Sequence, residues 1–338
     1  MPDPKTIKLM SCDFNWCYKG DVHQPAAAQD WAFVDPRAYF DWHLEFGANV
    51  MFCHAYIFSG CAYYPTKLGP VAPGPGCELF PALYELAQQA KLPTWSYFCA
   101  GADLTISNVQ QNWVLPGTRD FPQAAYGFLA PESEWTDLLC ARVEEFLSLY
   151  PVDWLLFDWF IYGWFYPDQY PLRPAPFVAQ PFEEIIGRPL PATAEEITPE
   201  EGVAYKREVL ARQFRRLRDT VKATSPGTRL MFNVPYTRAD DPLWVDHPMV
   251  RESDALFAEC TDPAVMEWLL SVRRPEQRLM TTIVGRVDGE CDPASWRRWH
   301  EAGCDFMAYA WGSPPDFRPH PRYDEELAIA RAAFEEIG

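Results

Sequence analysis

VDWLLFDWFIYGWFYPD, residues 152–168, is an apolar run that ends at one aspartate and continues into aromatic residues. A short continuous apolar run between helical stretches is typical of a strand buried on both faces, as in a parallel sheet. Such a strand would carry Asp158 at its carboxyl end, and Trp159 would open the next loop. The stretch therefore predicts a buried strand that presents one carboxylate at a rim of aromatic rings.

Runs of the same kind recur along the chain, and amphipathic stretches separate most of them. The expected strands are 7–14, 48–55, 93–100, 152–158, 229–236, 254–260, 278–285 and 304–311. The expected helices are 36–47, 79–90, 131–150, 200–223, 262–274, 292–303 and 323–337. Eight buried strands alternating with helices predict an α/β fold, a (β/α)8 TIM barrel with long βα loops. A doubly wound open sheet is the alternative, but the GxGxxG fingerprint is absent after the first strand.

The alternation fills the chain, so we expect residues 1–338 to form a single catalytic barrel domain. The fourth strand is followed by an elaborated loop, residues 159–199. Because proline lacks an N–H and fixes φ, we expect the prolines in this loop to exclude helix. They are Pro167, Pro171, Pro174 and Pro176.

The net charge of -18 argues against a nucleic-acid partner and against an anionic membrane surface. A small neutral carbohydrate or glycoside is the partner that this charge favours. No run approaches the roughly 18 apolar residues of a membrane span. The sequence leaves open whether the chain forms a homo-oligomer.

The ten cysteines are scattered without a CxxC pair, and the six histidines lack HExxH-like spacing. We therefore expect no metal site and no cofactor. The opening residues MPDPKTIKLM lack the pattern of a signal peptide, and free thiols without a signal indicate the cytoplasm.

In a barrel of this type the active site lies at the carboxyl ends of the strands. Asp158 and Glu259 are prominent there because each ends an otherwise apolar run. Strands four and six are close enough around the barrel for these carboxylates to reach the ~5–5.5 Å separation of a retaining glycosidase pair. Strand-end acids can also cap loops or pair with arginine, and that interpretation stays open.

Other polar and aromatic side chains fall at the same end of the barrel and could bind the hydroxyl groups and ring faces of a sugar. The expected substrate-binding residues are Asp13, His54, Tyr64, Trp113, Trp159, Asn233, Arg286 and Trp311. A core position remains the alternative for each aromatic residue, and a structural histidine remains the alternative for His54.

With these residues placed, the chain resembles a barrel family of hypothetical glycosyl hydrolases. This family is related to the α-L-fucosidases and more distantly to the α-galactosidase clan. The segments that carry the resemblance are GCAYYPTKLGPVAPG (60–74), NVQQNWVLPG (108–117), PVDWLLFD (151–158) and FEEIIGRPLP (182–191). The resemblance implies that Asp158 occupies the nucleophile position of the fucosidases. It also implies that Glu259 matches the acid/base strand of the α-galactosidase-like enzymes.

The sequence thus favours a retaining, exo-acting glycoside hydrolase with Asp158 as nucleophile and Glu259 as acid/base. Two alternatives remain. One is a metal-dependent sugar isomerase, epimerase or lyase on the same barrel, with His54, Asp158 and Glu259 as ligands. The other is a carbohydrate-binding barrel without catalysis.

Overall fold

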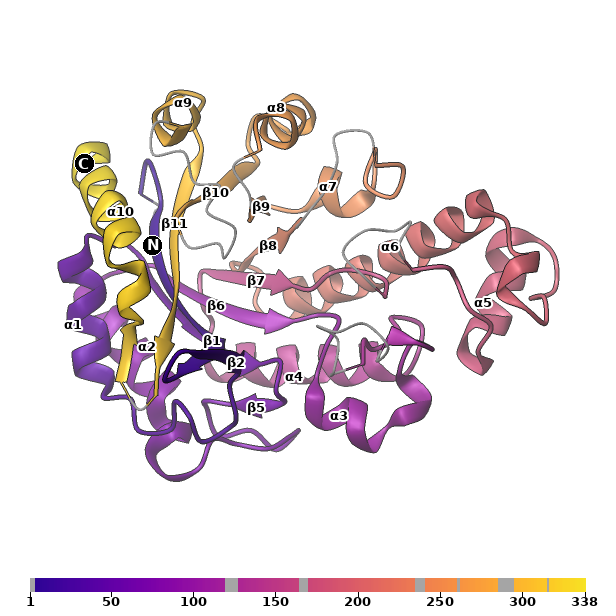
Figure 1. Ribbon diagram of the computed structural model, residues 1–338, viewed down its shortest axis with the longest axis horizontal. Helices are drawn as coiled ribbons and strands as arrows, with labels where there is room; N and C mark the ends of the chain where they lie inside the picture. Colours follow the sequence, from indigo (N-terminus) through magenta and orange to yellow (C-terminus); the bar gives the residue numbers. More distant parts are fainter. Residues whose placement is uncertain are drawn as a thin grey trace.

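The computed structural model describes residues 4–118, 127–163, 170–234, 241–259, 262–284, 295–314 and 316–338. Within these ranges, eight parallel strands form one curled sheet with helices on its outside (Figure 1). They are β1 (Lys8–Lys19), β3 (Met51–His54), β6 (Thr94–Cys99), β7 (Trp154–Asp158), β8 (Arg229–Asn233), β9 (Ala255–Ala258), β10 (Arg278–Val284) and β11 (Asp305–Ser313). The predicted strands are confirmed, and most ends differ by only a few residues.

The order of the parallel strands in the sheet is β1-β11-β10-β9-β8-β7-β6-β3. Each strand therefore lies beside its neighbour in the chain, and the first strand pairs with the last. The two ends of this path also meet, because β1 and β3 lie against each other. There the backbone N–H of Asn49 donates to the carbonyl of Lys8 (3.0 Å). This circular order confirms the predicted (β/α)8 barrel.

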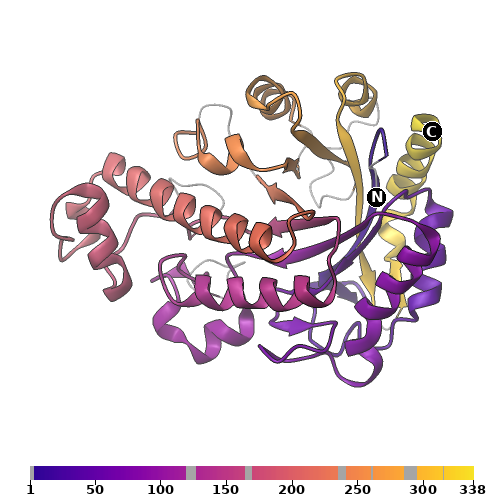
Figure 2. The same ribbon diagram turned by 180° about the vertical axis from the view of Figure 1, so that it is seen from behind.

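Helices follow the strands and cover the outer face of the sheet (Figures 1 and 2). They are α1 (Pro36–Phe46), α2 (Leu79–Ala90), α4 (Trp135–Leu149), α6 (Pro199–Thr224), α7 (Pro248–Glu252), α8 (Pro263–Val272), α9 (Ser295–Glu301) and α10 (Asp324–Ile337). The prediction missed α7, because its single turn is too short to show helical periodicity. The prediction located the other helices.

The helix ends follow ordinary capping chemistry. Asp35 precedes α1 and accepts hydrogen bonds from the backbone N–H groups of Arg37 and Ala38. Before α6, Thr198 and Glu201 form a reciprocal capping box. These local signals explain why the two predicted starts lie within a residue of the observed ones.

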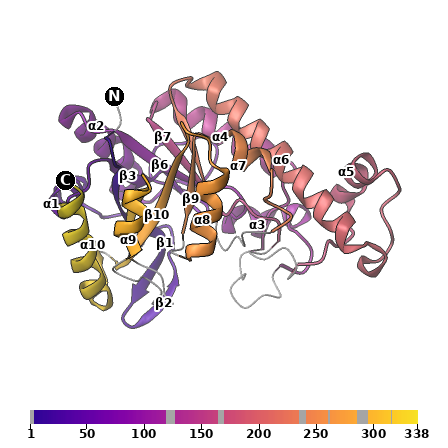
Figure 3. The same cartoon turned by 90° about the horizontal axis from the view of Figure 1, so that it is seen from above.

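The insertion after β7 contains a helix that the prediction excluded. Helix α5 (Pro176–Ile186) starts with Pro176 and continues through Pro181. Proline fits the first helical turn because the N–H that it lacks would have no partner there, so the expectation that Pro176 prevents helix was wrong. Helix α5 packs on α6, and together they project away from the barrel (Figures 1 and 3).

Two hairpins lengthen the barrel at β1 and β11. Strand β2 (Val22–Pro25) pairs antiparallel with β1, and β12 (Asp316–Pro319) pairs antiparallel with β11. At the other end of the barrel, the rings of Trp95 and Trp154 stack at 4.8 Å. Because the residues between these two levels are buried on both faces of the sheet, the strands are mostly apolar, with a few small buried polar residues such as Ser96 and Thr281.

Candidate active site

A pocket opens at the carboxyl ends of the parallel strands, and its empty space, counted together with the adjoining open solvent, is about 270 Å³. Side chains two residues apart on the same strand line it, because alternate residues of a strand point to the same face. The lining residues are Ser11, Asp13, Asn15, Phe52, His54, Tyr97, Leu156, Asp158, Asn233, Phe257, Glu259, Met307 and Tyr309. The cavity thus gathers Asp13, His54, Asp158, Asn233 and Glu259 from the predicted site.

Asp158 is the last residue of β7, and three donors hold its carboxylate. Tyr97 donates its hydroxyl to Oδ2 (2.9 Å). The backbone N–H of Trp159 (2.7 Å) and the side-chain amide of Asn233 (2.8 Å) donate to Oδ1. Burial raises the pKa of Asp158, and these three hydrogen bonds oppose that rise by stabilising the ionised form. The carboxylate is held in place with its negative charge only partly offset.

The backbone turns sharply directly after Asp158. Trp159 has φ 54°, an uncommon conformation for a bulky residue. The carbonyl of Asp158 accepts from the N–H of Ala100 (2.7 Å), and the carbonyl of Trp159 lies over Gly101. A Cβ atom on Gly101 would come within 2.3 Å of that carbonyl oxygen. The missing side chain at Gly101 therefore permits the turn that ends β7 at Asp158.

Asn233 joins the two predicted catalytic carboxylates. Its Nδ2 donates to Asp158 Oδ1 (2.8 Å) and to Glu259 Oε2 (2.9 Å). Asn233 ends β8, where it pairs with Phe257 of β9, and Glu259 follows two residues after Phe257. Since one nitrogen contacts both oxygens, those oxygens lie closer together than the ~6.5 Å at which the separations of inverting glycosidases begin.

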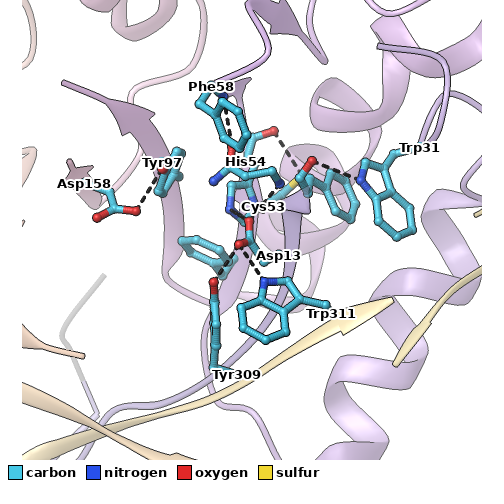
Figure 4. A network of polar contacts seen from close by, with 12 residues as sticks. Asp13, Trp31, Cys53, His54, Phe58, Tyr97, Asp158, Tyr309 and Trp311 are labelled. Atoms are coloured by element: carbon cyan, nitrogen blue, oxygen red, sulfur yellow. Dashed lines mark hydrogen bonds and ion pairs between the residues drawn. The ribbon is translucent and has the colours of Figure 1, made fainter. Parts of the chain in front are cut away.

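On the other side of the cavity, Asp13 accepts four hydrogen bonds (Figure 4). Its Oδ1 accepts from the Asn15 N–H (2.8 Å) and contacts His54 Nε2 (3.2 Å). Its Oδ2 accepts from Tyr309 (2.6 Å) and from the indole of Trp311 (3.1 Å). Burial alone would raise the pKa of Asp13, but the hydrogen bonds and the charge of His54 together hold it below its ordinary value.

The orientation of His54 follows from its contact with Asp13. Because Nε2 faces the carboxylate, the opposite ring nitrogen, Nδ1, is left buried and without a hydrogen-bond partner in the structure. The ring is 2% exposed and lines the cavity. An orphaned nitrogen at this place suits a ligand hydroxyl group.

Several predicted binding residues lie elsewhere. Tyr64 is fully buried and packs on Phe146 and Tyr150, outside the cavity lining. Trp113, at the end of a short 3-10 helix (Gln111–Trp113) after β6, is half-buried and does not line the cavity. Trp311 does not line the cavity, but its indole N–H donates a hydrogen bond to Asp13, which does. Arg286 lies outside the described residues.

The aromatic residues after Asp158 mostly build the core. The ring of Trp159 lies against Phe58 and Phe128, and neither it nor Phe160 lines the cavity. The hydroxyl of Tyr162 donates to Glu132 (2.7 Å), behind the active-site wall. Among the described residues of this stretch, the aromatic rings therefore pack around the strand end and do not line the cavity.

Sequence reasoning missed Tyr97 and Tyr309, which hold Asp158 and Asp13. Both occupy inward positions of predicted strands. Tyr309 lies two residues before the predicted Trp311, and Tyr97 lies two residues before Cys99, which pairs with Asp158. Counting back by two from each strand end would have placed both side chains in the cavity.

Two absences hold for the described part of the chain. No group of three or more His, Cys, Asp or Glu side chains there is arranged to hold a metal ion. No helix there is long and apolar enough to cross a membrane.

No protein-family model and no curated protein matches this sequence. Solved structures do match it. α-L-Fucosidase isoenzyme 2 from Paenibacillus thiaminolyticus superposes with a TM-score of 0.69 at 17% identity, covering 98% of this chain. The chain has the fold of the α-L-fucosidases. It spans about half of the Paenibacillus protein, 49% of its length.

The α-L-fucosidase AlfC from Lactobacillus casei, solved with α-L-fucose product, has the same fold. It matches with a TM-score of 0.50 at 13% identity, over 98% of this chain and 96% of that chain. An AlfC variant in complex with 4-nitrophenyl α-L-fucopyranoside matches with a TM-score of 0.52 at 13% identity, over the same shares of the two chains. At these identities the likeness to α-L-fucosidases is one of fold.

Proposed function

We propose that this protein is a retaining, exo-acting glycoside hydrolase that cleaves a neutral α-L-fucoside or a closely related glycoside, and that its barrel is a single catalytic domain. The observation that carries the proposal is the pair of carboxylates, Asp158 and Glu259, bound to one amide nitrogen of Asn233 in the pocket at the carboxyl ends of the strands. The fold shared with α-L-fucosidases supports the choice of sugar.

In the first step Asp158 attacks the anomeric carbon while Glu259 gives its proton to the leaving oxygen. The glycosidic bond breaks, and an ester bond joins the sugar to Asp158. In the second step Glu259 takes a proton from water, and the water oxygen displaces Asp158 from the anomeric carbon. Asp158 is thereby regenerated as a carboxylate, Glu259 recovers its proton, and the anomeric configuration is retained.

The short distance between the nearest oxygens of the two acids supports a retaining outcome. An inverting enzyme needs space for a water molecule between sugar and base, so its carboxyl groups lie about 6.5–9.5 Å apart. The shared contact with Asn233 brings the nearest oxygens of Asp158 and Glu259 closer than that. The nucleophile can then reach the anomeric carbon directly.

The composition of the cavity supports a fucose-like sugar. Phe52, Leu156, Phe257 and Met307 contribute apolar surface to the lining, next to the polar side chains. Fucose carries a methyl group where most hexoses carry a hydroxymethyl group, and that methyl group can bury against such surface. The hydroxyl groups would find hydrogen-bond partners in His54 Nδ1 and Asn233 Oδ1, both buried and without partners among the described residues. The small pocket would take a single terminal unit of a chain.

The test is hydrolysis of 4-nitrophenyl α-L-fucopyranoside by the purified protein and by Asp158→Ala. We expect turnover by the wild type, retention of configuration by NMR, and loss of at least about 10³-fold in the variant. Azide should restore turnover to Asp158→Ala and give a glycosyl azide, because it replaces the missing nucleophile. Glu335→Ala, an exposed acid on α10, is the matched control and should stay active. An Asp158→Ala protein that keeps more than a few per cent of the activity would overturn the assignment.

A further inference from the structure

Asn233 has one polar atom for which the structure provides no partner. Its Nδ2 makes two hydrogen bonds to the carboxylates, but its Oδ1 is buried and has no partner among the described residues. The residue is 1% exposed and lines the cavity. A buried polar group without a partner is costly, and in an active site it commonly awaits a ligand atom.

The orientation of the amide is fixed by its neighbours. Asp158 Oδ1 accepts in its ionised form, and Glu259 Oε2 accepts whether Glu259 is ionised or carries its proton on Oε1, so only the NH2 side of the amide can face them. Flipping the amide would put its oxygen against two carboxylate oxygens and lose both hydrogen bonds. The unpartnered oxygen is therefore the amide atom that makes no contact with the two carboxylates.

This geometry selects one group of the substrate. In a retaining reaction the anomeric carbon lies between the nucleophile and the acid/base, and Asn233 contacts both. Three polar groups surround an anomeric carbon: the glycosidic oxygen, the ring oxygen and the hydroxyl group on carbon 2. Neither of the first two carries a hydrogen in the bound glycoside. An acceptor such as Asn233 Oδ1 can bind only the third.

We infer that Asn233 is a specificity-determining residue that accepts a hydrogen bond from the 2-hydroxyl group of the sugar while its NH2 group positions Asp158 and Glu259. The inference rests on the proposed glycosidase function and deepens it. It restricts the substrates to glycosides with a hydrogen-bond donor at carbon 2. Hydrogen bonds to this hydroxyl group strengthen in the transition state, so the contact acts mainly on the rate of cleavage.

The experiment compares an aryl fucoside with its 2-deoxy analogue on the wild type and on Asn233→Ala. A 2-deoxy glycoside is intrinsically more reactive, but that difference is the same for both enzymes and cancels when the two ratios are compared. The quantity compared is the ratio of kcat/KM for the parent fucoside to kcat/KM for its 2-deoxy analogue. We expect this ratio to be about 100-fold larger for the wild type than for Asn233→Ala. Asn233→Ser, whose side chain is too short to span both carboxylates, serves as a second variant should Asn233→Ala fold poorly.

Tyr97→Phe is the matched control, since it removes the other side-chain hydrogen bond to Asp158 and leaves Asn233 intact. It should keep the full preference for the 2-hydroxyl group. If Asn233 only supports the structure, its variants lose activity equally on both substrates, and the inference is wrong while the glycosidase function stands. If the wild type cleaves neither glycoside, the proposed function fails and the inference fails with it.

Discussion

Two aspartates line the same cavity and differ in how the protein treats their charge. Asp13 accepts from four donors on β1, β3 and β11, and its pKa is lowered. Asp158 accepts from three donors, and burial nevertheless raises its pKa. The surroundings of Asp13 thus stabilise its ionised form, whereas the surroundings of Asp158 compensate the charge of its carboxylate only in part.

The two pKa shifts have opposite consequences for stability. The lowered pKa of Asp13 means that its ionisation stabilises the fold above the ordinary aspartate pKa, and that this contribution is lost as the pH falls through the lowered value. The raised pKa of Asp158 means that its ionisation costs stability as the pH rises past the ordinary value. We therefore expect Asp13 to act mainly in the scaffold, and on the proposed function the ionised Asp158 is the nucleophile at a cost in stability.

The backbone that follows each of the two aspartates also differs. Strand β1 continues beyond Asp13 to Lys19, with an irregularity in its pairing between Asp13 and Cys17. Strand β7 stops at Asp158, and Trp159 takes a left-handed conformation. Backbone strain of this kind is concentrated at functional sites, where the surrounding structure maintains it.

The largest effect should come from Asp158→Asn. This change keeps the shape of the side chain and removes its charge, so kcat/KM for an aryl fucoside should fall by at least about 10³-fold. The free energy of unfolding at neutral pH should stay the same or rise, because the buried charge is gone. Kinetics and urea denaturation of the same preparation check both parts. A variant that is inactive and also markedly less stable would place Asp158 in the scaffold.

Asp13→Ala should produce the reverse pattern, with stability as the main loss. It leaves Tyr309, Trp311 and His54 without their common acceptor, and breaking such a buried cluster costs about 3–5 kcal/mol. The difference from the wild type should shrink as the pH falls toward the lowered pKa of Asp13. Thermal or urea unfolding at several pH values measures it. A loss of stability independent of pH would mean that the charge of Asp13 does not contribute.

The sequence predicted the positions of the acidic residues at the strand ends better than it predicted the side chains around them. Apolar runs ending in Asp158 and Glu259 gave the strands, because only a strand covered on both faces can be apolar at every position. Tyr97 and Tyr309 were missed because their roles depend on which strand lies beside which. A single sequence does not show that pairing directly.

The aromatic run after Asp158 shows a second limit of sequence reasoning. Its composition is equally typical of a sugar-binding wall and of a packed core. The choice depends on the turn at Trp159, which directs the ring toward Phe58 and Phe128. That turn requires the absence of a side chain at Gly101, far away in the sequence. No local pattern could have revealed this dependence.

Gly101→Ala tests whether the turn holds Asp158 in its reactive position. The added Cβ would lie 2.3 Å from the carbonyl oxygen of Trp159, so the turn must move. We expect a loss of about 1–3 kcal/mol in stability and a fall in kcat/KM for the aryl fucoside of about 10-fold or more. Gly227→Ala is the control, since no atom lies within 4 Å of a Cβ there. Unchanged kinetics in Gly101→Ala would show that Asp158 does not depend on the turn.

The smallest effect should come from removing single hydroxyl groups on the two sides of the cavity. Tyr97→Phe takes one hydrogen bond from the ionised form of Asp158, so the pKa of Asp158 rises further. The acidic limb of kcat/KM should therefore move to higher pH, while the rate above that limb changes little. Tyr309→Phe takes the matching bond from Asp13 and should lower stability by about 1 kcal/mol without moving the limb. Full pH–rate profiles of both variants distinguish the two sides. If both variants moved the acidic limb equally, the two aspartates would titrate as one unit, and the division of the barrel mouth into scaffold and reactive group would be wrong.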